Sequence, residues 1–472
     1  MHLSLNFHLV VLAVYSAVLI VIGLVIGRRV RGSSEFFVAG RSLGPGLLLS
    51  TMLASNIGAG STVGATALGY SSGVAAWWWV GSAALGQIVL AVWIGPAMRR
   101  VAAAHDLRTV GDYLEFRYSA SVRGVVVALL WVGTLFILSG QLVAIGSILE
   151  TVAHIPASIG CAIGGLVVMV YFAAGGLMTS ARVNVLQLIV KLGGFALALP
   201  LAVSAIGGWS ALGRVQADNP TYWTFWRAGP PGLMLLAALT PSFIISPGIL
   251  QKVFGARDDR AVRVGVGMNA VGLLLYAPVP VLIGMAARAQ FPELTSVNNA
   301  LPMVLMYLLP PLVGAIGLAA VFSAEISASD AALFMLATSL SQDLYKRFVE
   351  PGAADARVLK VARVTSIVAS IVAVGLAIAL GSVVDALTIF YTLLSVSLFV
   401  PVLAGLYVPA ASAPAAMTSI ACGVVVVLAV QYLAGGSVAG FTPAFLGLCA
   451  AALGFAAMHA MRMGRYGGQH AV

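Results

Sequence analysis

Long apolar runs alternate with short polar connections along almost the whole chain. A helix needs about 20 apolar residues to cross the hydrocarbon core of a bilayer. Runs of this kind lie near residues 9–27, 44–70, 74–97, 121–149, 157–177, 183–206, 231–252, 262–288, 304–342, 358–381, 384–408, 413–434 and 442–463. The pattern predicts an all-α polytopic membrane protein with about 13 transmembrane helices. Because no long polar stretch interrupts it, we expect residues 1–472 to form a single transmembrane domain.

The composition supports this fold class and excludes others. Hydrophobic residues make up 61% of the 472 positions and charged residues only 8%, against about 25% charged residues in soluble proteins. Such a chain cannot cover a water-facing surface, which argues against a soluble enzyme and against nucleic acid as a partner. The three cysteines lie in apolar runs, the six histidines form no metal-spaced pair, and no nucleophile motif stands out. We therefore predict no enzymatic activity and no cofactor.

Lysine and arginine residues predict the orientation in the membrane. If the N-terminus lies outside, 21 of the 25 cationic residues, Lys252 among them, fall in cytoplasmic connections. Only Arg214, Arg227 and Arg288 then fall outside, and Lys191 lies within a helix. Cytoplasmic loops are enriched in Lys and Arg. We therefore expect a multi-pass protein of the plasma (cytoplasmic) membrane with the N-terminus outside and the C-terminus in the cytoplasm.

Two of the predicted helices are interrupted. The second contains Ser-Asn-Ile-Gly-Ala-Gly-Ser-Thr at positions 55–62, at mid-membrane depth. Its glycines either form a small-residue packing face or break the helix and free carbonyls for a cation or substrate. The seventh contains Pro241 and Pro247 around Ser246. Interrupted helices at matching places in two halves are typical of inverted-repeat transporters.

The five-helix spacing between the interrupted helices predicts the organisation of the chain. Spans 2–6, residues 44–206, would form the first repeat, and spans 7–11, residues 231–408, the second. An extra N-terminal helix at 9–27 and two C-terminal helices at 413–463 would flank this expected five-plus-five inverted repeat with discontinuous helices.

Several motifs resemble those of the sodium:solute symporter family. They are Glu-Phe-Phe-Val-Ala-Gly-Arg-Ser-Leu at 35–43, Ala-Ser-Asn-Ile at 54–57, Gly-Gly-Leu at 175–177, Gln-Lys at 251–252, Gly-Ala-Arg at 255–257 and Asp-Leu-Tyr-Lys at 343–346. The resemblance extends from about residue 10 to 410. It implies the inverted-repeat fold of LeuT-type carriers and sodium-coupled symport of a small organic solute by alternating access.

The resemblance also implies a sodium site between the second and ninth helices. Its ligands would be the carbonyls of Ala54 and Ile57, a carbonyl of Ala324 and the hydroxyl of Ser327. Ala328 stands where relatives commonly have Ser or Thr, so one ligand hydroxyl is missing. A bond from the Ser327 hydroxyl to its own helix is the alternative without an ion.

Charged residues at membrane depth form a second set of candidates. Members with a second sodium site have Asp where this chain has Asn184, so we expect no second sodium site. Lys191 lies about two turns further on the same face of that helix, and Glu325 and Asp330 lie beside the predicted ligands. They either tie two helices together as a structural ion pair or take part in coupling, with the ammonium in the place of a cation or a carboxylate binding a proton. A proton-coupled or sodium-independent carrier is thus the alternative to sodium symport.

The substrate cavity is expected midway between the repeats. Its predicted lining is Asn56, Ser61, Trp78, Ser139, Gln141, Phe243, Ser246 and Tyr391. Trp78 and its neighbours Trp77 and Trp79 equally suit an aromatic belt at the membrane interface. The expected partners are a small-molecule solute and the lipid bilayer, and the oligomeric state stays open. A transporter-like membrane receptor is a further alternative, which the short polar tail disfavours.

Overall fold

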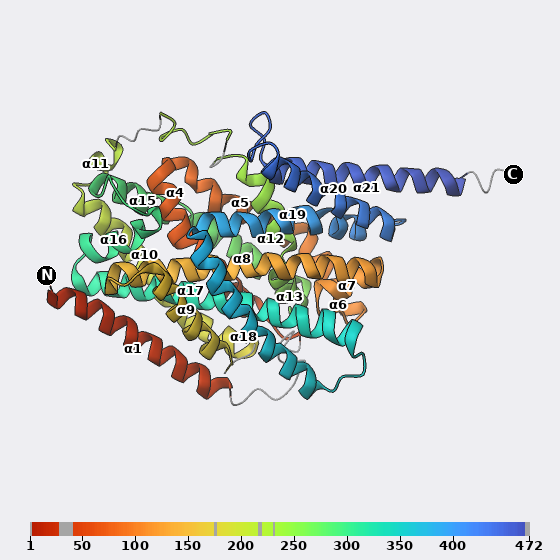
Figure 1. The fold of residues 1–472 in the computed structure, drawn as a ribbon, viewed down its shortest axis with the longest axis horizontal. Helices are drawn as coiled ribbons and strands as arrows, with labels where there is room; N and C mark the ends of the chain where they lie inside the picture. The colour runs from red at the N-terminus through yellow and green to blue at the C-terminus, as the bar shows by residue number, and fades with distance from the viewer. Residues whose placement is uncertain (1, 28–40, 174–176, 216–219, 230–231, 468–472) are drawn as a thin grey trace.

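Helices account for nearly all of the regular structure. A computed structural model describes residues 2–27, 41–173, 177–215, 220–229 and 232–467, and Figure 1 shows its helices lying mainly along one axis. Helix α1 (His2–Gly27) begins at one end of the molecule, and α21 (Pro443–Gly467) ends at the other. Ten helical stretches within the described ranges are long and apolar enough to cross a membrane. The predicted all-α polytopic fold is confirmed, whereas the count of 13 spans stays a prediction.

The described segments between residues 44 and 206 form a succession of helical elements. They are α3 (Pro45–Asn56), η2 (Gly60–Gly64), α4 (Ala65–Ser72), η3 (Gly73–Ala76), α5 (Trp77–Val89), η4 (Leu90–Ile94), α6 (Gly95–Ala104), α7 (Val110–Arg117), α8 (Ala120–Ala153), α9 (Ala157–Ala173) and α10 (Leu177–Ala205). The short helix α11 (Trp209–Gly213) follows in the connection between the predicted repeats.

The second half has a similar succession. It comprises α12 (Leu235–Ile245), α13 (Pro247–Phe254), α14 (Asp259–Tyr276), α15 (Pro278–Gln290), η5 (Val297–Asn299), α16 (Ala300–Met303), η6 (Val304–Leu308), α17 (Pro311–Thr338), η7 (Ser339–Val349), α18 (Asp355–Leu380) and α19 (Val383–Tyr407). Helices α20 (Ala413–Tyr432) and α21 close the chain.

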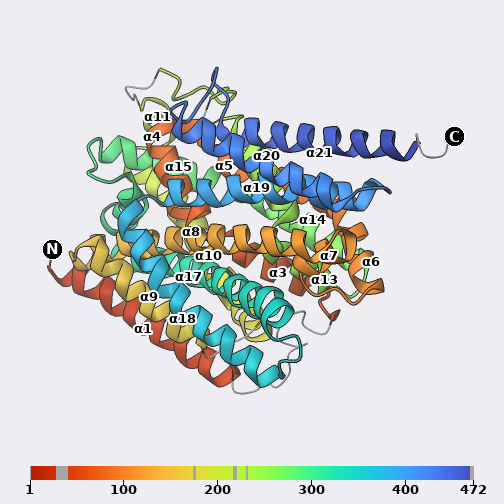
Figure 2. The same ribbon diagram turned by 45° about the vertical axis from the view of Figure 1, so that its right-hand side comes forward.

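The long helices α8 and α17 lie at the centre of the bundle. Each packs against the other, and α8 also contacts α19 while α17 contacts α10. Both views show α1, α9 and α18 on one side of this centre and α20 with α21 on the opposite side (Figures 1 and 2). The interrupted helices pack within this assembly, α3 against α10, α14 and α17, and α12 against α5 and α19. The two breaks therefore lie in the interior.

Both predicted interruptions are present. Helix α3 ends at Asn56, and Ile57 leaves helical geometry with φ −92° and ψ 88° before the π-helical turn η2 begins at Gly60. Helix α12 ends where Ser246 adopts φ −51° and ψ 128°, and Pro247 then opens α13. Proline has no N–H to donate and suits the first turn of a new helix. The local sequence thus explains both discontinuities.

Glycine lets α4 and α15 approach until their backbones touch. A Cβ on Gly284 would lie 2.1 Å from the Thr66 carbonyl oxygen, and one on Gly69 would lie 2.4 Å from the Val281 carbonyl oxygen. Small residues permit this close approach between membrane helices.

We expect Gly284→Ala to destabilise the protein by about 1–3 kcal/mol, because the added methyl group forces two packed backbones apart. Thermal unfolding in detergent measures the effect. Gly193→Ala on α10 is the matched control, since a Cβ there meets no atom within 4 Å. Equal melting temperatures for the two variants would contradict the packing argument.

Candidate functional site

The break in α3 releases two backbone carbonyls. In a continuous helix the Ala54 oxygen would accept from the Gly58 N–H, and the Ile57 oxygen from the Ser61 N–H. Here the Gly58 N–H donates to the Ser61 hydroxyl at 3.1 Å, and the Ser61 N–H donates to the Gly58 oxygen at 2.9 Å. The Ala54 and Ile57 oxygens are therefore free to accept from elsewhere.

The ammonium of Lys191 occupies the position toward which these carbonyls point. Its Nζ, carried by α10, donates to the Ala54 oxygen at 2.7 Å, the Ile57 oxygen at 3.1 Å and the Ser327 Oγ at 2.5 Å. Lys191 is fully buried, with 0% exposure. A lysine ammonium has three donors and no acceptor, so these three oxygens satisfy it. The structure thus brings together three of the predicted sodium ligands around a side chain of the protein itself.

The other two residues predicted at the sodium site, Ala324 and Ala328, lie beside the residues whose oxygens accept from the ammonium of Lys191. The Ala324 oxygen accepts from the Ser327 hydroxyl at 3.1 Å, and the Ala54 oxygen is the alternative acceptor at the same distance. Ala328 packs against the break, because a Cβ on Gly58 would lie 2.4 Å from the Ala328 Cβ. With an alanine methyl group at this position, the ring of oxygens is smaller than the family resemblance implies.

A buried carboxylate lies near the ammonium. Glu325 is fully buried on α17, and its Oε1 accepts from the Thr62 hydroxyl at 2.7 Å. Its Oε2 has no hydrogen-bond partner among the described residues. Glu325 interacts electrostatically with Lys191, whereas Asp330 interacts with Lys252. The two carboxylates on α17 thus interact with two different lysines.

Asn184 precedes Lys191 by seven residues on α10. Its side chain lies outside the described part of the structure. The prediction that this position excludes a second sodium site therefore stays a prediction.

Lys252 is a further site residue, absent from the predicted set. Rather than in a connection, it lies within α13, which extends to Phe254, and it is only 8% exposed. Its Nζ donates to the Thr51 oxygen at 3.0 Å and to the Ser55 hydroxyl. The break at Pro247 was the available signal, because it directs a new helix into the interior.

A cavity lies between the two broken helices and the central pair α8 and α17. Six of the residues predicted to bind substrate line it, namely Asn56, Ser61, Gln141, Phe243, Ser246 and Tyr391. Lys252 and Asp330 line it as well. The cavity therefore combines amide and hydroxyl groups, aromatic rings and one charge of each sign.

The two remaining predicted residues lie elsewhere. The Trp78 indole donates to the Phe225 oxygen at 2.9 Å and packs against the rings of Phe225 and Trp226. The Ser139 hydroxyl donates to the Phe136 oxygen at 2.8 Å in its own helix. Neither Trp78 nor Ser139 is among the residues that line the described cavity.

A chain of three amides, two of them buried, runs from the break and is not among the predicted features. Asn56 donates to the Asn269 Oδ1 at 3.3 Å, and Asn269 donates to the Gln87 Oε1 at 3.2 Å. Gln87 in turn donates to the Phe243 oxygen at 2.7 Å. The chain joins α3, α14, α5 and α12 and orients the amide of Asn56 at the cavity.

Gln141 ties the break to α8. Its Oε1 accepts from the Ala59 N–H at 2.8 Å, in a region where both residues are buried. An unpaired buried N–H costs about 1–3 kcal/mol. The Gln141 amide thus supplies an acceptor that the broken helix lacks.

We expect Gln141→Leu to destabilise the protein by about 1–3 kcal/mol, because the Ala59 N–H loses its acceptor. Thermal unfolding in detergent provides the measurement. Ser147→Ala on the same helix is the control, since the Ser147 hydroxyl only bonds back to the Val143 oxygen. If Gln141→Leu unfolded no earlier than this control, the amide would have no role in supporting the break.

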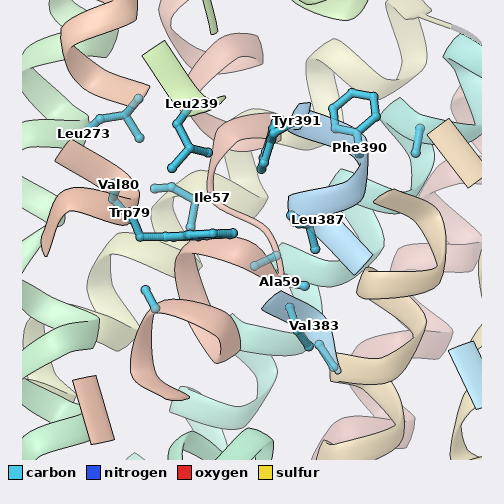
Figure 3. Packing of buried hydrophobic residues seen from close by; sticks show 14 of the residues in the cluster. Ile57, Ala59, Trp79, Val80, Leu239, Leu273, Val383, Leu387, Phe390 and Tyr391 are labelled. Atoms are coloured by element: carbon cyan, nitrogen blue, oxygen red, sulfur yellow. The ribbon is translucent and has the colours of Figure 1, made fainter. Parts of the chain in front are cut away.

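Apolar side chains close the cavity on one side. Figure 3 shows Trp79 beside Ile57, with Leu387 and Tyr391 on the facing helix. The Trp79 and Tyr391 rings meet edge to face with centroids 6.1 Å apart. A Cβ on Gly60 would lie 2.8 Å from the Leu387 Cδ2. Close packing of these side chains therefore bounds the cavity on this side.

On the side away from Trp79, the cavity extends along the helices of the bundle. Thr51, Lys252 and Met335 line it there, from α3 before its break, α13 and the later part of α17. Helices α13, α6 and α7 lie toward the end of the molecule at which α21 ends (Figure 1). The cavity is therefore directed toward the end that carries the C-terminal part of α21.

Comparison with known proteins agrees with this architecture. The profile of the sodium:solute symporter family matches residues 36–423. The sodium/glucose cotransporter of Vibrio parahaemolyticus is 26% identical over 422 residues, covering 79% of this chain and 75% of that protein. The sodium/pantothenate symporter of Escherichia coli (strain K12) is 28% identical over 335 residues, covering 66% of each chain. A substrate-bound, outward-open Na+-coupled sialic acid symporter has the same fold, with a TM-score of 0.80 at 18% identity over 96% of this chain and 98% of that one.

Proposed function

Since the chain belongs to the sodium:solute symporter family, we propose that it is a secondary active transporter that carries a small organic solute by alternating access. The observation that carries the proposal is the cavity between the two interrupted helices, closed by apolar packing on one side. Solute sites near the midplane, formed by discontinuous helices, are characteristic of inverted-repeat carriers. The proposed repeats are residues 44–206 and 231–408.

The described conformation corresponds, in this proposal, to an inward-facing state. The protein resides in the plasma (cytoplasmic) membrane with its N-terminus outside and its C-terminus in the cytoplasm. The cavity then leads to the cytoplasm, and the packing of Trp79 against Tyr391 is the closed outer barrier. The distribution of cationic residues supports this orientation.

The cavity lining favours a polar solute. Asn56, Ser61, Gln141 and Ser246 supply amide and hydroxyl groups, and Tyr391 supplies an aromatic face. A few placed polar groups in a largely apolar cavity fix the orientation of a bound molecule. Glucose, pantothenate and sialic acid, the solutes named for the two relatives and the structural neighbour, are the first candidates for testing.

Sodium is the coupling ion that membership of the family supports. Its proposed ligands are Ala54, Ile57, Ala324 and Ser327. A carrier that is independent of sodium or coupled to protons is the second candidate, and one observation favours it. The ammonium of Lys191 lies within hydrogen-bonding distance of three of the proposed ligand oxygens.

Solute uptake into proteoliposomes tests the proposal. We expect at least one of the three solutes to accumulate above the level of protein-free liposomes when a sodium gradient or a proton gradient is imposed separately. Gln141→Leu should lower this uptake, because Gln141 lines the cavity and supports the break. A wider panel of amino acids, carboxylates, vitamins, sugars and polyols follows if these three fail. Absence of gradient-driven uptake across that panel would contradict the transport function.

A further inference from the structure

We propose that the ammonium of Lys191 is a tethered cation that permanently fills the ion site at the break of α3, so that transport needs no sodium there. The inference rests on the proposed transport function, but not on the identity of the solute. It assigns to a side chain of the protein the place of an ion that must otherwise bind and leave in each cycle.

The ammonium of Lys191 and a sodium ion cannot occupy the site at the break at the same time. Oxygens of Ala54, Ile57 and Ser327 surround the Lys191 Nζ at 2.5 to 3.1 Å. A sodium ion held by the same three oxygens would occupy the space of the ammonium. Sodium can therefore bind to these oxygens only after the lysine side chain has moved away from them.

Packing opposes the departure of the lysine. Lys191 is fully buried on α10, which packs against both α3 and α17. The three oxygens belong to these two neighbouring helices, so the ammonium joins all three elements. A lysine withdrawn from them would need other acceptors for its three N–H groups in an apolar environment.

Charge balance points the same way. The Glu325 carboxylate attracts the ammonium of Lys191, and the ammonium of Lys252 on α13 repels it. The charge of Lys252 is in turn attracted by the carboxylate of Asp330. One ammonium and one carboxylate thus balance at the break. A sodium ion added beside Lys191 would leave an uncompensated positive charge, which is costly within a membrane.

Removal of the lysine should create a sodium site. In Lys191→Ala the released carbonyls, the Ser327 hydroxyl and the Glu325 charge remain, and the space of the side chain becomes available. We expect purified Lys191→Ala protein to bind ²²Na⁺ saturably and to melt at a higher temperature in sodium chloride than in choline chloride. Wild-type protein should show neither sodium binding sensitive to Ser327→Ala nor a sodium-dependent melting temperature.

Three controls locate the effect. Ser327→Ala added to Lys191→Ala should abolish the gained binding, because it removes one of the three oxygens. Lys191→Met should gain less binding than Lys191→Ala, since its side chain still fills the space. Lys252→Ala removes another buried lysine, which contacts Thr51 and Ser55 instead, and should gain no binding sensitive to Ser327→Ala.

Two results would overturn the inference. One is saturable ²²Na⁺ binding to the wild-type protein that Ser327→Ala abolishes, and the other is folded Lys191→Ala protein, monodisperse in size-exclusion chromatography, that gains no binding. If Lys191→Ala does not fold, the wild-type measurement decides alone. Sodium binding needs no transport, so a gain in Lys191→Ala without any solute uptake would support the tethered cation and count against the proposed function only.

Discussion

Glu325→Ala is expected to lower the free energy of unfolding by about 3–5 kcal/mol and to abolish solute uptake. Removing one of two interacting buried charges leaves the other uncompensated, and costs of this size follow. Here the charge left behind is the ammonium of Lys191, with which Glu325 interacts electrostatically. The Thr62 hydroxyl also loses its acceptor at 2.7 Å and keeps the Gly58 oxygen at 3.0 Å.

Thermal unfolding in detergent and uptake into proteoliposomes measure the two effects. Glu293→Ala replaces an exposed glutamate and should change stability by no more than about 0.5 kcal/mol. The double variant Glu325→Gln with Lys191→Met removes both charges and should be more stable than Glu325→Ala. If Glu325→Ala were as stable as the Glu293→Ala control, the two buried charges would not depend on each other.

Gly58→Ala is expected to destabilise the protein by about 1–3 kcal/mol and to reduce uptake strongly. The new methyl group would lie 2.4 Å from the Ala328 Cβ and 2.9 Å from the Gln141 Oε1. It must push α17 and α8 away from the break, which separates the released carbonyls from Ser327.

Gly46→Ala is the matched control for Gly58→Ala. Gly46 lies near the start of the same helix α3, and a Cβ there meets nothing within 4 Å. We expect its melting temperature and uptake to remain near those of the wild type. Normal uptake by Gly58→Ala would show that the close contact at the break is dispensable.

The interruptions of α3 and α12 could be predicted from the sequence because their causes are local. Gly58 and Gly60 loosen the helix that begins with α3, and Pro247 starts a new helix after Ser246. Such residues act on their own backbone, whatever packs against them. The fold class followed from the same local patterns.

The partners within the site depend on packing between distant segments. The resemblance to the family supplied Ala54, Ile57 and Ser327 as a group, but not the side chain that fills the space between them. Gln87 and Asn269 are 182 positions apart and meet only because α5 packs against α14. The buried position of Lys252 depends on packing in the same way, since its charge alone does not reveal that the short helix α13 packs in the interior.

The balanced charges of Lys191 and Glu325 have an electrical consequence. Moving one elementary charge across a membrane is worth about 2.3 kcal/mol per 100 mV. A carrier that takes up sodium with a neutral solute draws on this voltage in every cycle. A carrier whose cation is a side chain returns that charge with the empty protein, so its cycle with a neutral solute transfers no net charge unless another ion accompanies it. The membrane potential would then add no energy to the transport of a neutral solute, and accumulation of that solute would have to be driven by an ion that binds elsewhere than at the break.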